Sequence, residues 1–282
     1  MTDQPPDQPP AVRPPASITF VGTATTLLRL GGVTVLTDPN FIRKGERAYL
    51  GKGLWSRRLT DPALAPAELP RLDAVVLSHL HGDHWDRVAR AELDRELPVL
   101  TTPPAARTLS RRQGFRRAVG MATWQAETLT RDGTSVRITA MPGRHARGAM
   151  RALLPPVMGS LLEVERAGAP GRPADRPFRL YVTGDTLCVD ELRTIRELYP
   201  ELDAMVIHLG GTRVLGALVT MDGRQGCDLL DLLRPDRVLP VHYDDYGAFK
   251  SGLDDFAAEA RRRGWSDRVT YLARGETIAL PG

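Results

Sequence analysis

The sequence predicts an α+β fold in which two related half-sheets face one another. The first observation is a pair of short β-rich runs over residues 17–38, joined by a two-glycine turn and ending at Asp38. The second is a similar pair over residues 160–186, which closes with Asp185. The third is the alternation, in both halves, of strand-like runs with segments of helical spacing.

Composition limits the class of protein. The chain has 282 residues with 42% hydrophobic content, which is enough to bury a large core in one domain. Its 38 Lys+Arg and 34 Asp+Glu are dispersed, so no basic run indicates nucleic-acid binding. Cys188 and Cys227 are far apart, which predicts packing roles in a reducing compartment. No apolar run reaches the roughly 20 residues of a membrane helix and no signal pattern is present, so we expect a cytoplasmic protein.

Residues 1–16 are dominated by Pro, Gln and Asp, and we expect them to form a disordered tail, because they offer too little apolar surface to offset the entropy of ordering. Residues 17–282 are expected to form one folded domain. Runs rich in β-branched residues predict its strands. These cover residues 17–22, 26–30, 33–37, 74–77, 98–101, 118–119, 127–129, 135–140, 160–165, 179–182, 204–208, 237–242, 269–272 and 277–280.

Between the strands, apolar residues at helical spacing predict helices, the second of which ends at Gly114. They cover residues 85–97, 104–113, 190–199, 225–233 and 254–263. The segment 40–71 has no clear period and is rich in Gly, Pro, Arg and Lys. A stretch of this length is either a functional lid over a site or a solvated connector, and the sequence does not choose between them.

Potential metal ligands are concentrated directly after the apolar run 74–77. His79, His81, Asp83 and His84 fall within six residues, a density that no packing requirement explains. Imidazole and carboxylate groups suit Zn²⁺, Fe or Mn. All six histidines lie at or just beyond the C-terminal ends of expected strands, the remaining three being His145, His208 and His242.

The motif His79-x-His81-x-Asp83-His84, followed in order by His145, Asp185 and His242, is similar to that of the metallo-β-lactamase superfamily. Further motifs resemble the branch that includes L-ascorbate-6-phosphate lactonase and the N-acyl-phosphatidylethanolamine-hydrolysing phospholipase D. They are Thr37-Asp38-Pro39, Pro142-Gly143-Arg144-His145, Thr183-Gly184-Asp185-Thr186 and Val241-His242-Tyr243-Asp244-Asp245-Tyr246. His208 departs from the small or aliphatic residue of relatives. The resemblance implies a four-layer αββα sandwich for the hydrolase domain, residues 17–282, with the active site along one edge.

Carried onto these positions, the resemblance implies two divalent metal ions, Zn²⁺ first and Mn²⁺ or Fe²⁺ as alternatives. One ion would be held by His79, His81 and His145, the second by Asp83, His84 and His242, with Asp185 bridging both. Two such ions lower the pKa of a shared water to about 7 from about 15.7, which makes hydroxide the nucleophile. We therefore expect hydrolysis of an ester, lactone or phosphodiester bond in a small or lipid-like substrate. No GxSxG motif indicates a covalent mechanism instead.

Supporting roles are assigned with an alternative beside each. Asp83, Asp185 and His208 are the expected catalytic residues, His208 either as a proton donor or anion-holding group or as a packed histidine. Asp38 either orients a ligand histidine or is a turn residue. The expected substrate-binding residues are Arg144, Trp55 and Tyr243, where Arg144 is alternatively a solvated surface charge and Tyr243 alternatively supports His242. Lys44, Arg47 and Lys52 either bind phosphate or are solvated charges.

Two other functions compete with the hydrolase. A nuclease of the same fold would usually add a basic arm, and no insertion here is long or basic enough. A non-catalytic metal-binding or regulatory protein would not need the intact ligand set. We expect a small-molecule or lipid-like substrate as the partner, with self-association into a homo-oligomer left open.

Overall fold

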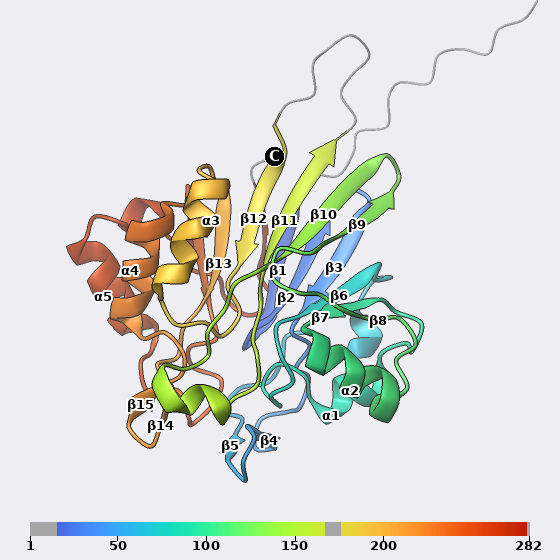
Figure 1. The fold of residues 1–282 in the computed structure, drawn as a ribbon, viewed down its shortest axis with the longest axis horizontal. Helices are drawn as coiled ribbons and strands as arrows, with labels where there is room; N and C mark the ends of the chain where they lie inside the picture. Colours follow the sequence, from blue (N-terminus) through green and yellow to red (C-terminus); the bar gives the residue numbers. More distant parts are fainter. Residues whose placement is uncertain (1–15, 167–175, 281–282) are drawn as a thin grey trace, which may run out of the picture.

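Two β-sheets pack face to face in the computed structural model, which describes residues 16–166 and 176–280, and helices cover both outer faces (Figure 1). The first sheet has the order β17-β1-β2-β3-β6-β7-β8. Its strands are β1 (Ser17–Gly22), β2 (Thr25–Leu30), β3 (Val33–Thr37), β6 (Ala74–Leu77), β7 (Val99–Thr101), β8 (Ala118–Gly120) and β17 (Thr277–Ala279). This is the four-layer αββα arrangement that the family resemblance implied.

The second sheet has the order β16-β13-β12-β11-β10-β9. Its strands are β9 (Ala126–Arg131), β10 (Thr134–Met141), β11 (Gly159–Arg166), β12 (Phe178–Val182), β13 (Ala204–His208) and β16 (Arg237–Val241). The helices are α1 (Arg87–Glu92), α2 (Pro103–Gln113), α3 (Arg193–Leu198), α4 (Gly223–Leu233) and α5 (Leu253–Arg262). Figure 1 shows α1 and α2 beside the first sheet and α3, α4 and α5 beside the second.

Two small hairpins and four 3₁₀ turns complete the described chain. The hairpins are β4 (Arg47–Tyr49) with β5 (Trp55–Arg57) and β14 (Arg213–Val214) with β15 (Ala217–Leu218). The turns are η1 (Pro66–Glu68), η2 (Gly148–Ala152), η3 (Asp190–Leu192) and η4 (Ser266–Arg268). Both hairpins and η2 lie at the same end of the sandwich (Figure 1).

The predicted half-repeat is present in the strand pairing. In the first sheet β2 pairs antiparallel with β3, which then pairs parallel with β6. In the second sheet β11 pairs antiparallel with β12, which then pairs parallel with β13. Asp38 directly follows β3, and Asp185 follows β12. The matching crossovers bring both aspartates to the same edge of the sandwich.

The strands of the first sheet are apolar on both faces because both faces are covered. Leu28 and Val76 belong to the large core that joins the two sheets. Their neighbours Leu27 and Val75 point the opposite way, into a second core under α1 and α2. This period of two explains why the sequence shows near-continuous apolar runs here rather than strict alternation.

Several predicted boundaries differ from the structure. Residues 269–272 form no strand, since Val269 makes only one isolated bridge, with Val238. The expected helix 85–97 shortens to α1 because the Asp86 carboxylate caps its start by accepting from Ala89 N at 2.7 Å. The predicted tail lies outside the described residues except for Ala16, which is buried and accepts a hydrogen bond from Leu280 N.

The segment 40–71 is more ordered than its composition suggested, because a buried arginine anchors it. Arg58 has no exposed surface, and its guanidinium donates to the Asn40 and Thr60 carbonyls at 3.1 and 3.0 Å. It also lies 3.8 Å from the Asp245 carboxylate, which follows β16. These contacts therefore hold the β4–β5 hairpin in place at its C-terminal end. Across the described residues, no helix is long and apolar enough to cross a bilayer.

Candidate metal centre

The seven predicted ligands meet at one edge of the sandwich because each follows the C-terminal end of a strand. His79, His81, Asp83 and His84 lie in the loop after β6. His145, Asp185 and His242 follow β10, β12 and β16, which run in the same direction in the second sheet. The described ligands fall into two groups that share this edge.

Three ring nitrogens form the first group. His79 Nε2 lies 2.9 Å from His81 Nδ1, and His145 Nε2 lies 3.2 Å from the same atom. The other ring nitrogen of His145 donates to the Val219 carbonyl at 2.6 Å, so its Nε2 carries a free lone pair. The distal nitrogen of His79 lies 3.0 Å from Ser78 Oγ. These rings direct lone pairs at one point.

The second group combines two histidines with two carboxylates. His84 Nε2 lies 3.1 Å from His242 Nε2 and 3.1 Å from Asp185 Oδ2. Asp83 Oδ2 lies 3.4 Å from His242 Nε2. Asp185 Oδ2 is also 4.0 Å from His79 Nε2, so this carboxylate stands between the two groups. These four side chains form a second group that could hold a cation, next to the first.

The side chains of the second group fit a metal ion because several of their buried lone pairs have no hydrogen-bond donor. The Nδ1 atom of His242 faces the Leu209 carbonyl at 3.1 Å, and that of His84 faces Asp38 Oδ2 at 3.2 Å, so in the neutral rings that bind a metal ion both Nε2 atoms are acceptors. Acceptors 3.1 Å apart cannot bond to each other. Asp83 Oδ1 and Asp185 Oδ1 are buried without a hydrogen-bond partner. With both rings neutral, a cation between these groups satisfies all of them.

The charge state of the first group favours metal binding. Burial, reinforced by the neighbouring rings, lowers the pKa of His79 well below its usual range and that of His81 to about 4. Burial likewise lowers the pKa of His145. These rings are therefore neutral near pH 7, and their lone pairs are available without displacing protons.

In the second group, contacts between histidines and carboxylates together shift the pKa values more than burial does. Burial lowers the pKa of His84, but the carboxylates of Asp185, Asp38 and Asp83 outweigh that effect and raise it well above its usual range. Burial raises the pKa of Asp185, whereas His242 and His84 bring it well below its usual range. The carboxylates are therefore ionised, and the group attracts positive charge.

Asp38 supports the site from behind. Its Oδ1 accepts from Ser78 N at 2.7 Å, which fixes the start of the ligand loop, and its Oδ2 faces His84 Nδ1. Burial raises the pKa of Asp38, but His84 and His208 lower it to about 2, so the carboxylate is ionised. This is the contact expected of a residue that orients a ligand histidine.

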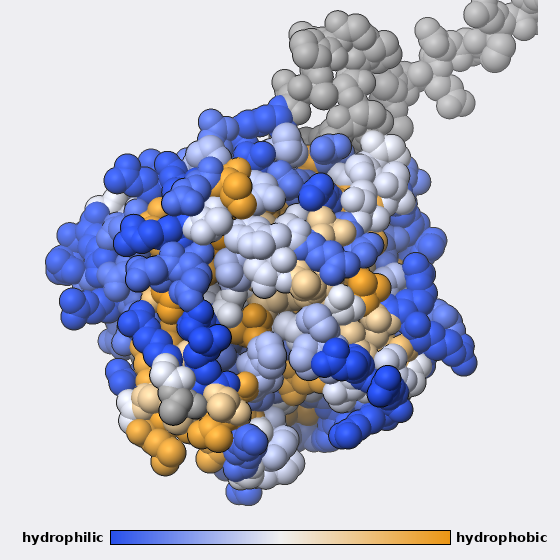
Figure 2. All heavy atoms as spheres, viewed as in Figure 1, coloured by the Kyte–Doolittle hydropathy of each residue, from blue (hydrophilic) through white to orange (hydrophobic). Residues whose placement is uncertain are grey.

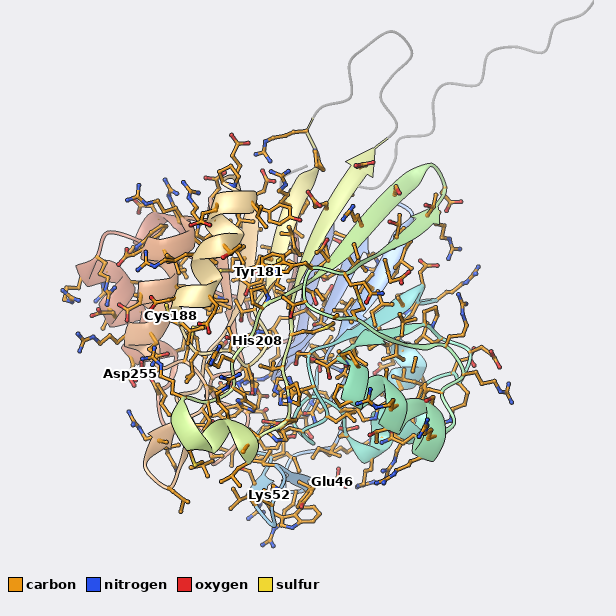
Figure 3. The ribbon with its side chains drawn as sticks, in the orientation of Figure 1. Glu46, Lys52, Tyr181, Cys188, His208 and Asp255 are labelled. Carbon is orange, nitrogen blue, oxygen red and sulfur yellow. The ribbon has the colours of Figure 1, made fainter. Side chains whose placement is uncertain are left out.

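His208 does not reach the open side of the site. It has no exposed surface, and its ring stacks on His84 at 5.9 Å between centroids. Its Nδ1 lies 3.2 Å from Thr183 Oγ1, while its Nε2 lies 3.4 Å from Asp38 Oδ2 without the alignment of a full hydrogen bond. Figure 3 places it inside the sandwich. Its contacts are with groups behind the ligands, not with the space in front of them.

A pocket of about 420 Å³ opens in front of the ligands. His81, Asp83, His145 and Asp185 form its floor. Its walls come from the β4–β5 hairpin, the segment around η2 and the β14–β15 hairpin. The β4–β5 hairpin lies close over the site, since a Cβ on Gly51 would approach His81 Nε2 to 3.4 Å. Of the two readings of segment 40–71, this position supports a cover over the site.

Of the three expected substrate-binding residues, one lines the pocket and two do not. Trp55 lines the pocket. Arg144 is not brought to it, because its guanidinium pairs with Glu191. Tyr243 is buried and packs against Phe20 with ring centroids 6.3 Å apart, so it belongs to the core. Of the three loop cations, only Lys52 lines this pocket, and Figure 3 shows it at the outer end of its hairpin.

The sequence did not single out the pocket walls contributed by η2 and the β14–β15 hairpin. Met150, Leu153, Leu154 and Leu215 line the pocket from these segments. The available signal was isolated large apolar residues in Gly- and Arg-rich stretches, where no core is expected. A larger hollow of about 670 Å³ lies around residues 66–73 and 92–98, and its lining holds none of the seven ligands.

Comparisons with known proteins agree with this geometry. The family model described as "Beta-lactamase superfamily domain" matches residues 34–243. A UPF0173 metal-dependent hydrolase of Deinococcus radiodurans is 31% identical over 211 residues, which are 73% of this chain and 80% of the relative.

Two solved structures share the fold. A possible metal-dependent hydrolase from Veillonella parvula has a TM-score of 0.77 at 22% identity and covers 95% of this chain and 100% of its own. Isothiocyanate hydrolase from Delia radicum gut bacteria has a TM-score of 0.76 at 20% identity, and the match covers 94% of this chain and 100% of that chain.

Proposed function

The chain belongs to the beta-lactamase superfamily and, within it, to the UPF0173 metal-dependent hydrolases, and on that premise we propose that it hydrolyses an ester, lactone or phosphodiester bond at a dinuclear metal centre. The observation that carries this proposal is the meeting of two ligand groups at Asp185, on the floor of an open pocket. A buried structural metal site would be closed to solvent, whereas an open side serves a reacting molecule.

The residues divide the work between two sites. His79, His81 and His145 would hold one ion, Asp83, His84 and His242 the second, and Asp185 would lie between them. Two divalent ions bound there would supply a nucleophilic water of lowered pKa and polarise the bond under attack. Zn²⁺ fits this mixture of imidazole and carboxylate best, with Mn²⁺ or Fe²⁺ as alternatives.

Asp83 has a second role in this proposal. It lines the pocket, and its Oδ1 is buried without a hydrogen-bond partner. An ionised carboxylate in that position can take the proton that the attacking water loses and return it to the leaving oxygen. Asp38 and His208 keep His84 in place from the opposite side.

The finer resemblance supports the choice of bond. The motifs around Asp38, His145, Asp185 and His242 are similar to those of the lactonase-like and phospholipase-D-like branch. The nuclease alternative has less support, because Lys52 and Arg213 are the only basic side chains in the pocket lining. A groove that tracks a phosphate backbone needs more positive charge than that.

The test combines metal content with turnover. We expect two equivalents of metal by elemental analysis and chelator-sensitive hydrolysis within a panel of p-nitrophenyl esters, bis(p-nitrophenyl) phosphate and lactones. An isothiocyanate belongs in the panel because one structural neighbour is named for that activity. Asp185→Asn and His81→Ala should lower metal content and reduce turnover by more than the roughly 10–100-fold typical of outer-shell changes.

The matched control is Asp190→Asn, which also neutralises a carboxylate but at a side chain that is 94% exposed. It should leave metal content and turnover unchanged. Protein that holds two metal ions and is inert on the whole panel would contradict the hydrolase and favour a metal-binding role. Salt-sensitive cleavage of RNA or DNA would favour the nuclease.

A further inference from the structure

Apolar side chains are exposed around the pocket far more than elsewhere. Nine large apolar residues are exposed in the described chain, and four of them, Leu54, Trp55, Leu153 and Leu215, line this one pocket. A fifth, Tyr49, packs on Trp55 with ring centroids 4.9 Å apart. Scattered apolar residues need no explanation, but a contiguous group around a site marks a binding surface.

Leu215 is the least expected of these residues. It is 90% exposed, and its φ of 49° is in the left-handed region. With Gly216 at φ 80° it forms the two-residue turn between β14 and β15, where Asn or Asp normally precedes glycine. A leucine there strains the backbone and exposes an apolar side chain, so stability of the turn does not explain it.

Three separate parts of the chain supply these side chains. Leu54 and Trp55 come from the β4–β5 hairpin, Leu153 and Leu154 from the segment after η2, and Leu215 from the β14–β15 hairpin. Figure 2 shows apolar surface gathered over η2 and the β14–β15 hairpin. Because no two of these segments are neighbours in sequence, their shared apolar character follows from the pocket that they enclose.

Charged groups are few in the pocket lining, and its polar side chains outside the ligand set and the two cations are Thr212 and Thr220. The carboxylates in the lining are Asp83 and Asp185, both assigned to the metal centre, and the cations are Lys52 and Arg213. Arg213 is partly engaged, with a contact of 3.8 Å to Asp222. The walls between floor and rim therefore offer apolar contact to whatever occupies them.

We propose that the substrate carries an uncharged alkyl or aryl group that lies between these three apolar loops while its hydrolysable bond lies over the ligand floor. This inference rests on the proposed function for the position of the bond, but the apolar subsite can be measured without turnover. Leu54, Leu153 and Leu215 determine specificity in this arrangement. A volume of about 420 Å³ accommodates a medium-sized chain or ring.

The size of the effect follows from hydrophobic transfer. Each methylene removed from water should tighten binding about fourfold until the pocket is filled. A charged or strongly polar group at the same position should bind no better than the short-chain reference, because it would have to be desolvated against apolar walls.

The experiment is isothermal titration calorimetry of the full chain with butanoate, hexanoate and octanoate, in metal-loaded and chelator-treated protein. The dissociation constant is expected to fall about fourfold per methylene in both forms, with a negative heat-capacity change. The kcat/KM of p-nitrophenyl esters should rise along the same series.

Two variants locate the subsite. Leu215→Ser and Leu54→Ser should each weaken octanoate binding, with the double variant losing about tenfold or more, while butanoate binding and metal content stay unchanged. The matched control is Leu198→Ser on α3, which removes a leucine whose exposure of 57% lies between those of Leu54 (46%) and Leu215 (90%) and which does not line the pocket. It should leave the whole series unchanged.

The outcomes separate the two proposals. Chain-length-dependent binding without turnover would contradict the proposed function and keep the apolar subsite. Turnover together with a dissociation constant that does not change from butanoate to octanoate would overturn the apolar subsite. Flat binding together with Leu215-dependent sedimentation on phosphatidylcholine vesicles would also overturn it, by assigning the loops to a membrane surface instead.

Discussion

At the scale of single residues, the proposed ligand His84 is held by contacts at both nitrogens of its ring. Its Nε2 faces Asp185 and His242 in the site, and its Nδ1 faces Asp38. Asp38 in turn lies 3.4 Å from His208 Nε2. Since a carboxylate only accepts, the proton of the neutral His208 ring belongs on Nε2, and its Nδ1 lies 3.2 Å from the Thr183 hydroxyl, which donates to the Gly184 carbonyl at 3.0 Å.

His208→Ala tests this positioning role. Losing the ring frees Asp38 on one side, so we expect bound metal at saturation but an affinity weaker by roughly 10–100-fold, with lower turnover. His208→Gln, whose amide can still donate to Asp38, should recover most of the affinity. Metal titration of both variants checks this. Complete loss of one metal at saturation in both would identify His208 as a ligand.

At the scale of elements, the β4–β5 hairpin owes its position to Arg58. Arg58→Met leaves the Asn40 and Thr60 carbonyls without their buried donor, while Asp245 keeps Arg274 at 3.1 Å, so we expect the free energy of unfolding to fall by roughly 1–3 kcal/mol. Chemical denaturation measures this. Arg57→Met is the matched control, because Arg57 lies next to Arg58 on the same hairpin but is exposed. An equal effect of both variants would refute the anchoring role.

A second element, the α4–α5 pair, is joined by Arg263. Its guanidinium contacts Asp228 and Asp231 on α4 at 2.8 and 2.7 Å and Glu259 on α5 at 2.6 Å. Hydrogen bonds from Arg262 and Arg263 lower the pKa of Glu259 from 4.5 to about 2.

A carboxyl group whose pKa is lower in the folded than in the unfolded protein stabilises the fold fully at a pH above its unfolded-state pKa. That stabilisation is lost as the pH falls toward the folded-state pKa. Arg263→Gln should therefore be less stable than the parent at pH 7, and the difference should shrink between pH 4.5 and pH 2. Urea denaturation across this range measures it, with the exposed Arg261→Gln as control. A difference that is constant with pH would contradict the assignment.

At the scale of the whole molecule, the proposed metal centre joins the two sheets at one edge. Its ligands follow β6 in the first sheet and β10, β12 and β16 in the second. Without cations, the buried Asp83 and Asp185 Oδ1 atoms have no partner. Metal binding is therefore expected to stabilise the fold as well as to support chemistry.

Metal removal measures that link. Zn²⁺ at about 100 times its dissociation constant should add about 2.7 kcal/mol per site and raise the melting temperature by roughly 5–10 °C over chelator-treated protein. The melting temperature of Asp185→Asn should rise less on addition of Zn²⁺, whereas that of Asp190→Asn should rise as much as that of the parent protein. Identical melting curves with and without metal in the parent protein would show that the site does not couple to folding.

The sequence by itself determined the chemistry of the centre and the architecture around it. Ligand identity is a property of residue type, and a dense motif after a strand such as His79 to His84 is visible without coordinates. The half-repeat that ends in Asp38 and Asp185 was equally visible, because period-two patterns and turn glycines are local signals. These local signals predicted two related half-sheets with histidines at strand ends, and the family resemblance added the αββα sandwich with the site along one edge.

Only the tertiary structure decided which residues face the substrate space. It turned His208 and Tyr243 inward, paired Arg144 with Glu191, and brought Leu153 and Leu215 to the pocket. Pocket walls come from loops distant in sequence, and no periodicity encodes their meeting. Burial and contact depend on how the whole chain packs, so the direction of a side chain at a strand end cannot be read from its neighbours alone.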